Sequence, residues 1–215
     1  MKKENTTEEI IELKPIVPQT VTVTIVGDSD LILNKMNDVT TRQLTDARKD
    51  KAKDISKPNE WEEIITAIHW LNGKPKEFSE KTLKENLNPK NNAPCITAFG
   101  LKKSFEQAIT RNGLARYGTE FRATVNVIGE NDNLIPVKFT EYHLDEKLMS
   151  PKKGAPVLVK LNRFSGWSAT FKIKYLDNIY SLEQIANFIN LAGFGIGVGS
   201  GKNSDYGRYH IESIK

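Results

Sequence analysis

The sequence is poor in the residues from which many protein sites are built. It contains one cysteine, Cys95, and three histidines in 215 residues. A single cysteine excludes an internal disulfide and any metal site made of several cysteines, and we interpret Cys95 as a small buried side chain. We therefore expect neither a metal nor another cofactor.

Long apolar segments are missing as well. No run reaches the roughly 18 apolar residues that a membrane-spanning helix needs. The first residues are charged and have no apolar centre of the kind found in secretory signals. The expectation is a protein of the bacterial cytoplasm without a membrane partner.

Charge of one sign is only slightly in excess. The 31 basic residues exceed the 27 acidic ones by four, and the isoelectric point is near 9.0. This balance permits a nucleic-acid or other phosphate partner without requiring one. The length is sufficient for one good hydrophobic core with a subdomain attached to it.

Glycine, by contrast, is concentrated in one place. Every second residue from Gly193 to Gly201 is glycine, and a basic, aromatic segment follows. Glycine permits positive φ angles and close approach to the backbone, and a run of glycines can present several amides to one anion. Because a helix precedes the stretch and none follows it, the stretch is neither a Walker loop nor a dinucleotide fingerprint.

Two interpretations of this glycine stretch remain: a plain helix-to-strand connection, or a cradle for a phosphate backbone. We favour the cradle because cations and aromatic residues follow closely, and such groups hold single strands without reading their sequence. The predicted nucleic-acid-binding residues are glycines of the stretch, its flanking polar and aromatic residues, and cations expected nearby: Gly195, Gly197, Gly199, Gly201, Lys202, Tyr206, Arg208, His210, Lys35, Arg42, Arg48, Lys49 and Arg163.

Hydrophobic periodicity predicts a mixed fold. Alternation of apolar and polar residues predicts strands, and the turn-forming residues 129–133 suggest a hairpin between two of them. The expected strands are 20–26, 31–33, 121–128, 134–139, 157–163, 167–175 and 209–214.

Helical spacing and capping residues predict the other elements. The expected helices are 59–71, 78–87, 98–111 and a helix from Ser181 to the glycine stretch. The order of elements indicates an α+β fold, with an antiparallel sheet and helices on one face. A split βαβ, ferredoxin-like core fits this order best.

Residues 38–95 are expected to form an insertion made of a basic flap and helices, and residues 1–18 a flexible arm. The segment 38–57 has almost no core-forming residues and mixes basic with acidic ones. This composition fits a solvated, helix-prone segment with internal ion pairs. It also fits a mobile flap that closes over phosphates.

The C-terminal motifs resemble those of the RAMP superfamily, in particular small phage-encoded proteins similar to Cas7. A helix ending in Ala192-Gly193 is followed by the glycine stretch and by Gly207-Arg208-Tyr209-His210-Ile211. The family's usual Asp-Trp-Arg-Pro is here Val198-Gly199-Ser200-Gly201. This difference removes an arginine contact or shifts it to Lys202 or Arg208.

Motifs earlier in the chain agree with this resemblance in their order. They are similar to the family's first strand and the turn after it, its tryptophan-containing helix and Gly-Lys-Pro step, the helix under its sheet, and an arginine followed by a tryptophan: 23–37, 61–70 with 73–75, 100–108, and Arg163 with Trp167.

The resemblance implies a modified ferredoxin-like fold of the RNA-recognition type, forming one RAMP-like domain over residues 19–215. It also implies a phage-encoded protein that binds a nucleic-acid backbone beside further copies of itself. Some relatives cleave RNA with an acid or base beside a 2′-hydroxyl group. The corresponding candidates are His143, His210, Asp38, Asp46 and Asp50, but no convincing acid–base pair is visible, and we do not expect an enzyme.

Three functions remain open. The first is a non-catalytic protein that binds single-stranded RNA or DNA and oligomerises along it. The second is a phage anti-defence protein that sequesters a cyclic or short oligonucleotide signal, and the third is a metal-independent ribonuclease of the RAMP type. A groove that holds a backbone and stacks bases accepts RNA and DNA alike unless it contacts the 2′-hydroxyl.

Overall fold

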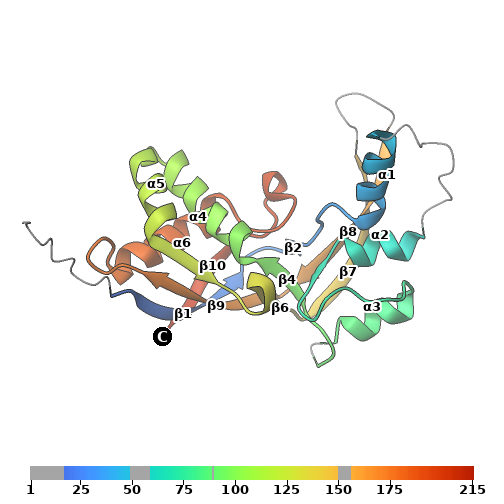
Figure 1. Ribbon diagram of the computed structural model, residues 1–215, viewed down its shortest axis with the longest axis horizontal. Helices are drawn as coiled ribbons and strands as arrows, with labels where there is room; N and C mark the ends of the chain where they lie inside the picture. Colours follow the sequence, from blue (N-terminus) through green and yellow to red (C-terminus); the bar gives the residue numbers. More distant parts are fainter. Residues whose placement is uncertain (1–16, 49–58, 89, 150–155) are drawn as a thin grey trace, which may run out of the picture.

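The computed structural model describes residues 17–48, 59–88, 90–149 and 156–215. The molecule is elongated, with a sheet covered by helices at one end and a mixed insertion at the other (Figure 1). No helix in these ranges is long and apolar enough to cross a membrane.

The main sheet has the strand order of a ferredoxin-like core. β1 (Gln19–Gly27) lies between β10 (Tyr209–Ile214) and β9 (Ser168–Tyr175), and β9 pairs on its other edge with β5 (Val125–Ile128) and β6 (Leu134–Lys138). All these pairs are antiparallel. β4 (Pro94–Thr97) and β3 (His69–Trp70) extend the sheet beyond β6.

Three helices cover one face of this sheet: α4 (Ala98–Arg111), α5 (Ala115–Thr124) and α6 (Leu182–Gly195) (Figure 1). α4 and α6 are the two crossover helices of the split βαβ pattern. The predicted α+β fold, with an antiparallel sheet and helices on one face, is therefore confirmed.

The core lies between the sheet and these helices. Val23 and Ile25 of β1 point inward beside Ile173 of β9, and Phe105 of α4 packs on them, all with no exposed surface. The threonines and lysines that alternate with them lie on the uncovered face, where the Thr24 and Thr170 hydroxyls are 3.0 Å apart. The period-two pattern predicted this division correctly.

A second, three-stranded sheet of order β2-β8-β7 was not expected. It consists of β2 (Leu31–Ile32), β8 (Val157–Ser165) and β7 (Glu141–Met149). The predicted strands 157–163 and 167–175 thus belong to different sheets, because the chain turns at Gly166, where φ is +58°.

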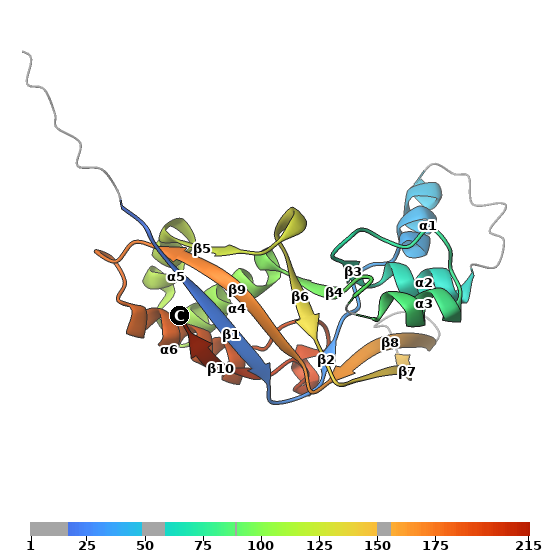
Figure 2. The ribbon, with the colours of Figure 1, turned by 90° about the horizontal axis from the view of Figure 1, so that it is seen from below.

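The far end of the molecule carries α1 (Asp38–Arg48), α2 (Glu60–Thr66) and α3 (Glu80–Asn86) (Figure 2). The helix predicted over 59–71 begins as expected, with the Asn59 side chain accepting a hydrogen bond from Trp61 N. It ends five residues early because His69 and Trp70 pair with β4.

The change from helix to strand has a local cause. The Trp70 indole donates to Ile65 O at 2.8 Å, which folds the segment back onto the end of α2. Ile68 and Trp70 are both buried. A spacing of two places side chains on one face of a strand but on different faces of a helix.

The predicted strand 121–128 is helical in its first half, because α5 continues to Thr124. Phe121 of α5 is fully buried and packs edge-on against Phe105 of α4. The predicted hairpin across 129–133 is also wrong. β5 and β6 follow one another along the same edge of β9, and the short 3₁₀ helix η1 (Asn131–Asn133) lies between them.

The segment 38–57 is helical as far as Arg48, and residues 49–57 lie outside the described ranges, as do residues 1–16. Two ion pairs link α1 to other segments. Arg42 pairs with Glu62 at 2.8 Å, and Asp38 pairs with Lys74. The flap and the division of the chain at 18, 38 and 95 stay predictions.

Candidate nucleic-acid interface

The α6–β10 loop (residues 196–208) contains most of the glycine stretch and folds back on its own chain. Val198 N donates to Gly207 O at 2.9 Å, Ser200 N to Ile32 O at 2.8 Å, and Gly207 N to Asp30 O at 2.8 Å. The loop is thus tied to β2 and to the turn before it. These amides are not available to an external anion.

Two glycines show why the loop needs this residue. Gly199 has φ +78°, and a Cβ there would lie 2.5 Å from Ile32 O. Gly207 has φ +71°, and a Cβ there would overlap the Val198 carbonyl. Both the left-handed backbone and the close approach require glycine.

The expected cradle of successive amides is therefore narrower than predicted. Gly195 belongs to α6, and Gly197 N donates to Ala192 O at 2.8 Å. Within the described part of the chain, the amides of Gly199 and Gly201 have no hydrogen-bond acceptor. Two separated donors remain in place of a continuous run.

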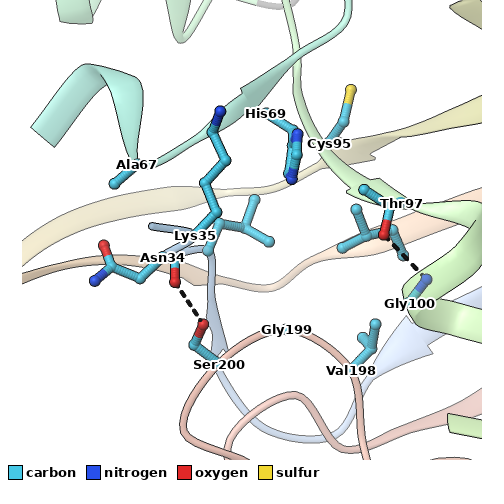
Figure 3. Close-up of a pocket in the computed structure, with 12 residues that line it drawn as sticks. Asn34, Lys35, Ala67, His69, Cys95, Thr97, Gly100, Val198, Gly199 and Ser200 are labelled. Carbon is cyan, nitrogen blue, oxygen red and sulfur yellow. Dashed lines mark hydrogen bonds between the residues drawn. The ribbon is translucent and has the colours of Figure 1, made fainter. Parts of the chain in front are cut away.

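One side of the loop closes a hollow of about 170 Å³, which we call the Lys35 hollow (Figure 3). Its walls come from the segment after β2, from β3 and β4, from the start of α4 and from the loop. The polar and charged residues among them are Asn34, Lys35, His69, Thr97 and Ser200.

The electrostatics of this hollow favour an anion. Lys35 is exposed and has no ion-pair partner among the described residues. α4 begins here, with Thr97 Oγ1 accepting from Gly100 N at 3.0 Å, and the start of a helix carries partial positive charge. Burial, and then the charge of Lys35, lower the pKa of His69, so this imidazole is neutral at pH 7.

Two buried groups line the hollow together with Lys35. Asn34 Oδ1 is buried and has no hydrogen-bond partner. Cys95 is fully buried, as predicted, and burial followed by the charge of Glu130 raises its pKa to about 12. The thiol therefore stays protonated and is not a nucleophile.

On the other side of the loop lies a second pocket of about 150 Å³, which we call the Arg111 pocket. Its polar walls bring two predicted residues, Lys202 and Arg208, together with residues of α4 and of the short 3₁₀ helix η2 (Lys202–Ser204): Gln107, Arg111 and Asn203.

Arg111 is not among the residues predicted from the sequence, although its spacing along α4 relates it to Gly100 and Gln107. Gly100, which lines the Lys35 hollow, precedes Gln107 and Arg111 by seven and eleven residues, so all three share one face of α4. The two openings therefore follow the same helix face, with the α6–β10 loop beside both.

Arg163, one of the predicted binding residues, donates hydrogen bonds to two carboxylates. Its Nε and Nη2 donate to the Asp145 carboxylate at 2.5 and 3.1 Å, and its Nη1 donates to Asp30 Oδ2 at 2.6 Å. Hydrogen bonds to Asp145 and then to Asp30 raise the pKa of Arg163. Two carboxylates neutralise this guanidinium, so the interface proposed below does not include it.

The other predicted residues are spread around these openings. Tyr206 is half-buried and lies over Gly201, and His210 Nδ1 is 2.6 Å from Asp28 Oδ1. Arg48 is the last residue of α1, and Arg42 of the same helix pairs with Glu62. Lys49 lies outside the described residues.

The two candidate catalytic histidines each contact a carboxylate. His143 Nε2 is 3.2 Å from Glu141 Oε2 on the same strand, and His210 contacts Asp28. The hydrogen bond from Lys74 outweighs burial and lowers the pKa of Asp38. Asp46 lies in α1, and Asp50 is outside the described residues. No cluster of three metal-ligating side chains occurs in the described ranges.

Comparison with known proteins supports the fold. No protein-family model and no curated protein matches the chain. The chain is similar to a chain of the type III-B Cmr-beta complex, whose structure was solved bound to cognate target RNA. The identity is 13%, the TM-score is 0.52, and the match covers 92% of this chain. This chain spans 60% of that protein's chain.

A second similar structure is Cmr6 from Pyrococcus furiosus. The identity is 10% and the TM-score 0.44, with coverage of 91% of this chain and 98% of that one. The chain has the ferredoxin-like fold that its sequence predicted, and it shares this fold with the chain of the Cmr-beta complex.

Proposed function

We propose that this protein binds single-stranded nucleic acid along the α6–β10 loop, with the strand's backbone following the exposed face of α4. One observation carries the proposal: the loop lies between two openings that each contain cations without an ion-pair partner among the described residues. These cations are Lys35 at one opening and Arg111 with Lys202 at the other.

RNA is the strand that we favour. The similar Cmr-beta complex was solved with its target RNA, and we choose RNA by analogy with that fold. We further propose, from the sequence resemblance, that the protein is phage-encoded, acts in the cytoplasm and assembles side by side on the strand. We also propose that the strand is bound without being cleaved.

Fluorescence anisotropy with a labelled, mixed-sequence single-stranded RNA tests this proposal. For single strands, each phosphate neutralised by a protein cation makes the slope of log affinity against log salt more negative by roughly 0.7. We expect strong salt dependence for the parent protein. Lys35→Gln should weaken binding several-fold and make the slope less negative by roughly 0.7.

Lys81→Gln is the matched control, because Lys81 is an exposed lysine on α3, away from both openings. It should bind like the parent. Affinity that does not change with salt, or an equal effect of the two substitutions, would contradict the proposal. The same samples, run on a denaturing gel after long incubation, show whether the RNA is cut, which would favour the ribonuclease alternative.

A further inference from the structure

We propose that the Arg111 pocket is a dedicated site for one phosphate group, bound by Arg111, Lys202 and Arg208. The inference deepens the proposed function, on which the source of the phosphate depends. It concerns a different opening from the Lys35 hollow, so the two can be tested separately.

Three cations reach this pocket from different parts of the chain. Arg111 comes from the last turn of α4, Lys202 from η2, and Arg208 from the residue before β10. Gln107 and Asn203 add amide groups that can donate hydrogen bonds. A pocket of about 150 Å³ with such walls fits a small, multiply charged oxyanion.

Arg208 supplies the strongest indication. Its Nη1 is buried and has no hydrogen-bond partner. A buried donor of this kind is costly unless a ligand satisfies it. The backbone N of Arg208 donates to Ser29 Oγ at 3.0 Å, which holds the residue in place. Its other nitrogen, Nη2, already donates to Asp205 and Lys202 O, at 2.9 and 3.4 Å.

The pocket keeps an excess of positive charge. Asp205 is the one carboxylate that contacts these cations within the described part of the chain, and its side chain is 85% exposed. Burial, and then the nearby charge of Arg111, lower the pKa of Lys202. An anion between the three cations would offset both the burial of the Lys202 charge and its repulsion by Arg111.

Phosphate fits these walls better than a carboxylate or a halide, because it has more charged oxygens and can contact three cations at once. Guanidinium groups bind phosphate oxygens through two parallel N–H donors, and lysine adds a point charge. Two sources share this chemistry: a phosphodiester inside a strand and the phosphomonoester at its end.

Thermal denaturation with inorganic phosphate tests the pocket without any nucleic acid. A ligand that binds only the folded state raises the melting temperature. At constant ionic strength, phosphate should stabilise the parent more than chloride does. Arg111→Gln should remove most of this difference, with about a tenfold or greater loss of phosphate affinity, the usual effect of deleting one charge-assisted hydrogen bond.

Arg111 is exposed, so this variant should fold, and Lys202→Gln is a second variant with the same expectation. Arg116→Gln, which changes an exposed arginine on α5, is the control for the general stabilising effect of phosphate. If Arg111→Gln and Lys202→Gln keep the full phosphate effect, the inference is overturned.

Two RNA strands of one sequence, with a 5′-phosphate or a 5′-hydroxyl end, distinguish the sources. Tighter binding of the phosphorylated strand, lost in Arg111→Gln, assigns the pocket to a strand end. Equal binding of both strands, with a salt slope reduced by roughly 0.7 in Arg111→Gln, assigns it to the backbone. No effect of Arg111→Gln on either strand would count against the site.

Failure of the proposed function gives a different result. In that case RNA binding would be absent or independent of salt, while the phosphate effect on melting persists. Lys35→Gln should in every case keep the phosphate effect of the parent, because Lys35 lines the other opening.

Discussion

Arg163 lies between two carboxylates that are distant in the sequence. Asp30 precedes β2 and Asp145 lies in β7, so the guanidinium joins the turn after β1 to the second sheet. Its side chain is 24% exposed. A charge in this position contributes to the fold, and each of its three nitrogens already donates to a carboxylate.

Arg163→Gln should therefore reduce stability and leave RNA binding nearly unchanged. We expect the free energy of unfolding, measured by urea denaturation at pH 7, to fall by about 1–2 kcal/mol, since hydrogen bonds to charged groups contribute about that much and partial exposure reduces the effect. RNA affinity should stay within about twofold, and a larger loss would return Arg163 to the interface.

The pH dependence of the same variant checks the mechanism. Burial is the largest influence on Asp30 and raises its pKa. Hydrogen bonds from Arg163 and Ser165, with the charges of Arg163 and His143, together outweigh burial, and the pKa lies below its ordinary 3.8. A lowered folded pKa gives stability that is present above the unfolded value and is lost as pH falls through the folded value. The difference between parent and Arg163→Gln should thus be full near pH 6 and narrow below pH 4. A gap that stays constant to pH 3 would argue against the ion pair as its cause.

At the scale of elements, the end of α6 and the α6–β10 loop that follows it need their glycines unequally. Gly207→Ala should cost more than about 2 kcal/mol, because it adds a strained φ to an overlap with the Val198 carbonyl. Gly195 ends α6 without a positive φ, and open space surrounds its Cβ position. Gly195→Ala should therefore stabilise the protein by about 0.5 kcal/mol.

Thermal or urea unfolding of the two variants measures this contrast. Equal destabilisation by both substitutions would mean that the whole loop tolerates no side chain. Equal tolerance would mean that the loop is freely mobile, and the internal hydrogen bonds of Val198 and Gly207 would then not form in solution.

The elements that were predicted correctly carry their information locally. Alternation in β1 and β9, the Ser181–Gln184 capping box and the Thr97 cap all act within a few residues of one another. The incorrect predictions depended on distant partners. β3 exists because β4 pairs with it, and the end of α5 is helical because Phe121 packs on α4.

The candidate interface shows the same limit. A basic residue near the glycine stretch could be recognised from the sequence, and Lys35, Lys202 and Arg208 do line the two openings. Whether a cation is already paired could not be recognised, because Arg163 and Asp30 are 133 positions apart. Arg111 was missed because helical spacing alone does not show which face meets the loop.

At the scale of the whole molecule, the α6–β10 loop lies where the main sheet meets the insertion. Ser200 bridges to Ile32 of the second sheet, while Tyr209 continues the chain into β10 of the main sheet. The walls of the Lys35 hollow come from the segment after β2, from β3 and β4, from the start of α4 and from the loop itself. The cations of both openings therefore lie beside this loop.

This placement predicts how copies share a strand. Binding through backbone phosphates and base stacking does not depend on the sequence of the strand, so each further stretch of the strand offers the same site. We expect the number of copies bound to one single-stranded RNA to increase with strand length, as measured by native mass spectrometry over a series of lengths. Lys35→Gln should lower occupancy at every length, whereas Lys81→Gln should not. One copy per strand at all lengths would contradict side-by-side assembly and favour sequestration of a short oligonucleotide. A site for a short oligonucleotide binds one segment of fixed size, so the stoichiometry would not depend on strand length.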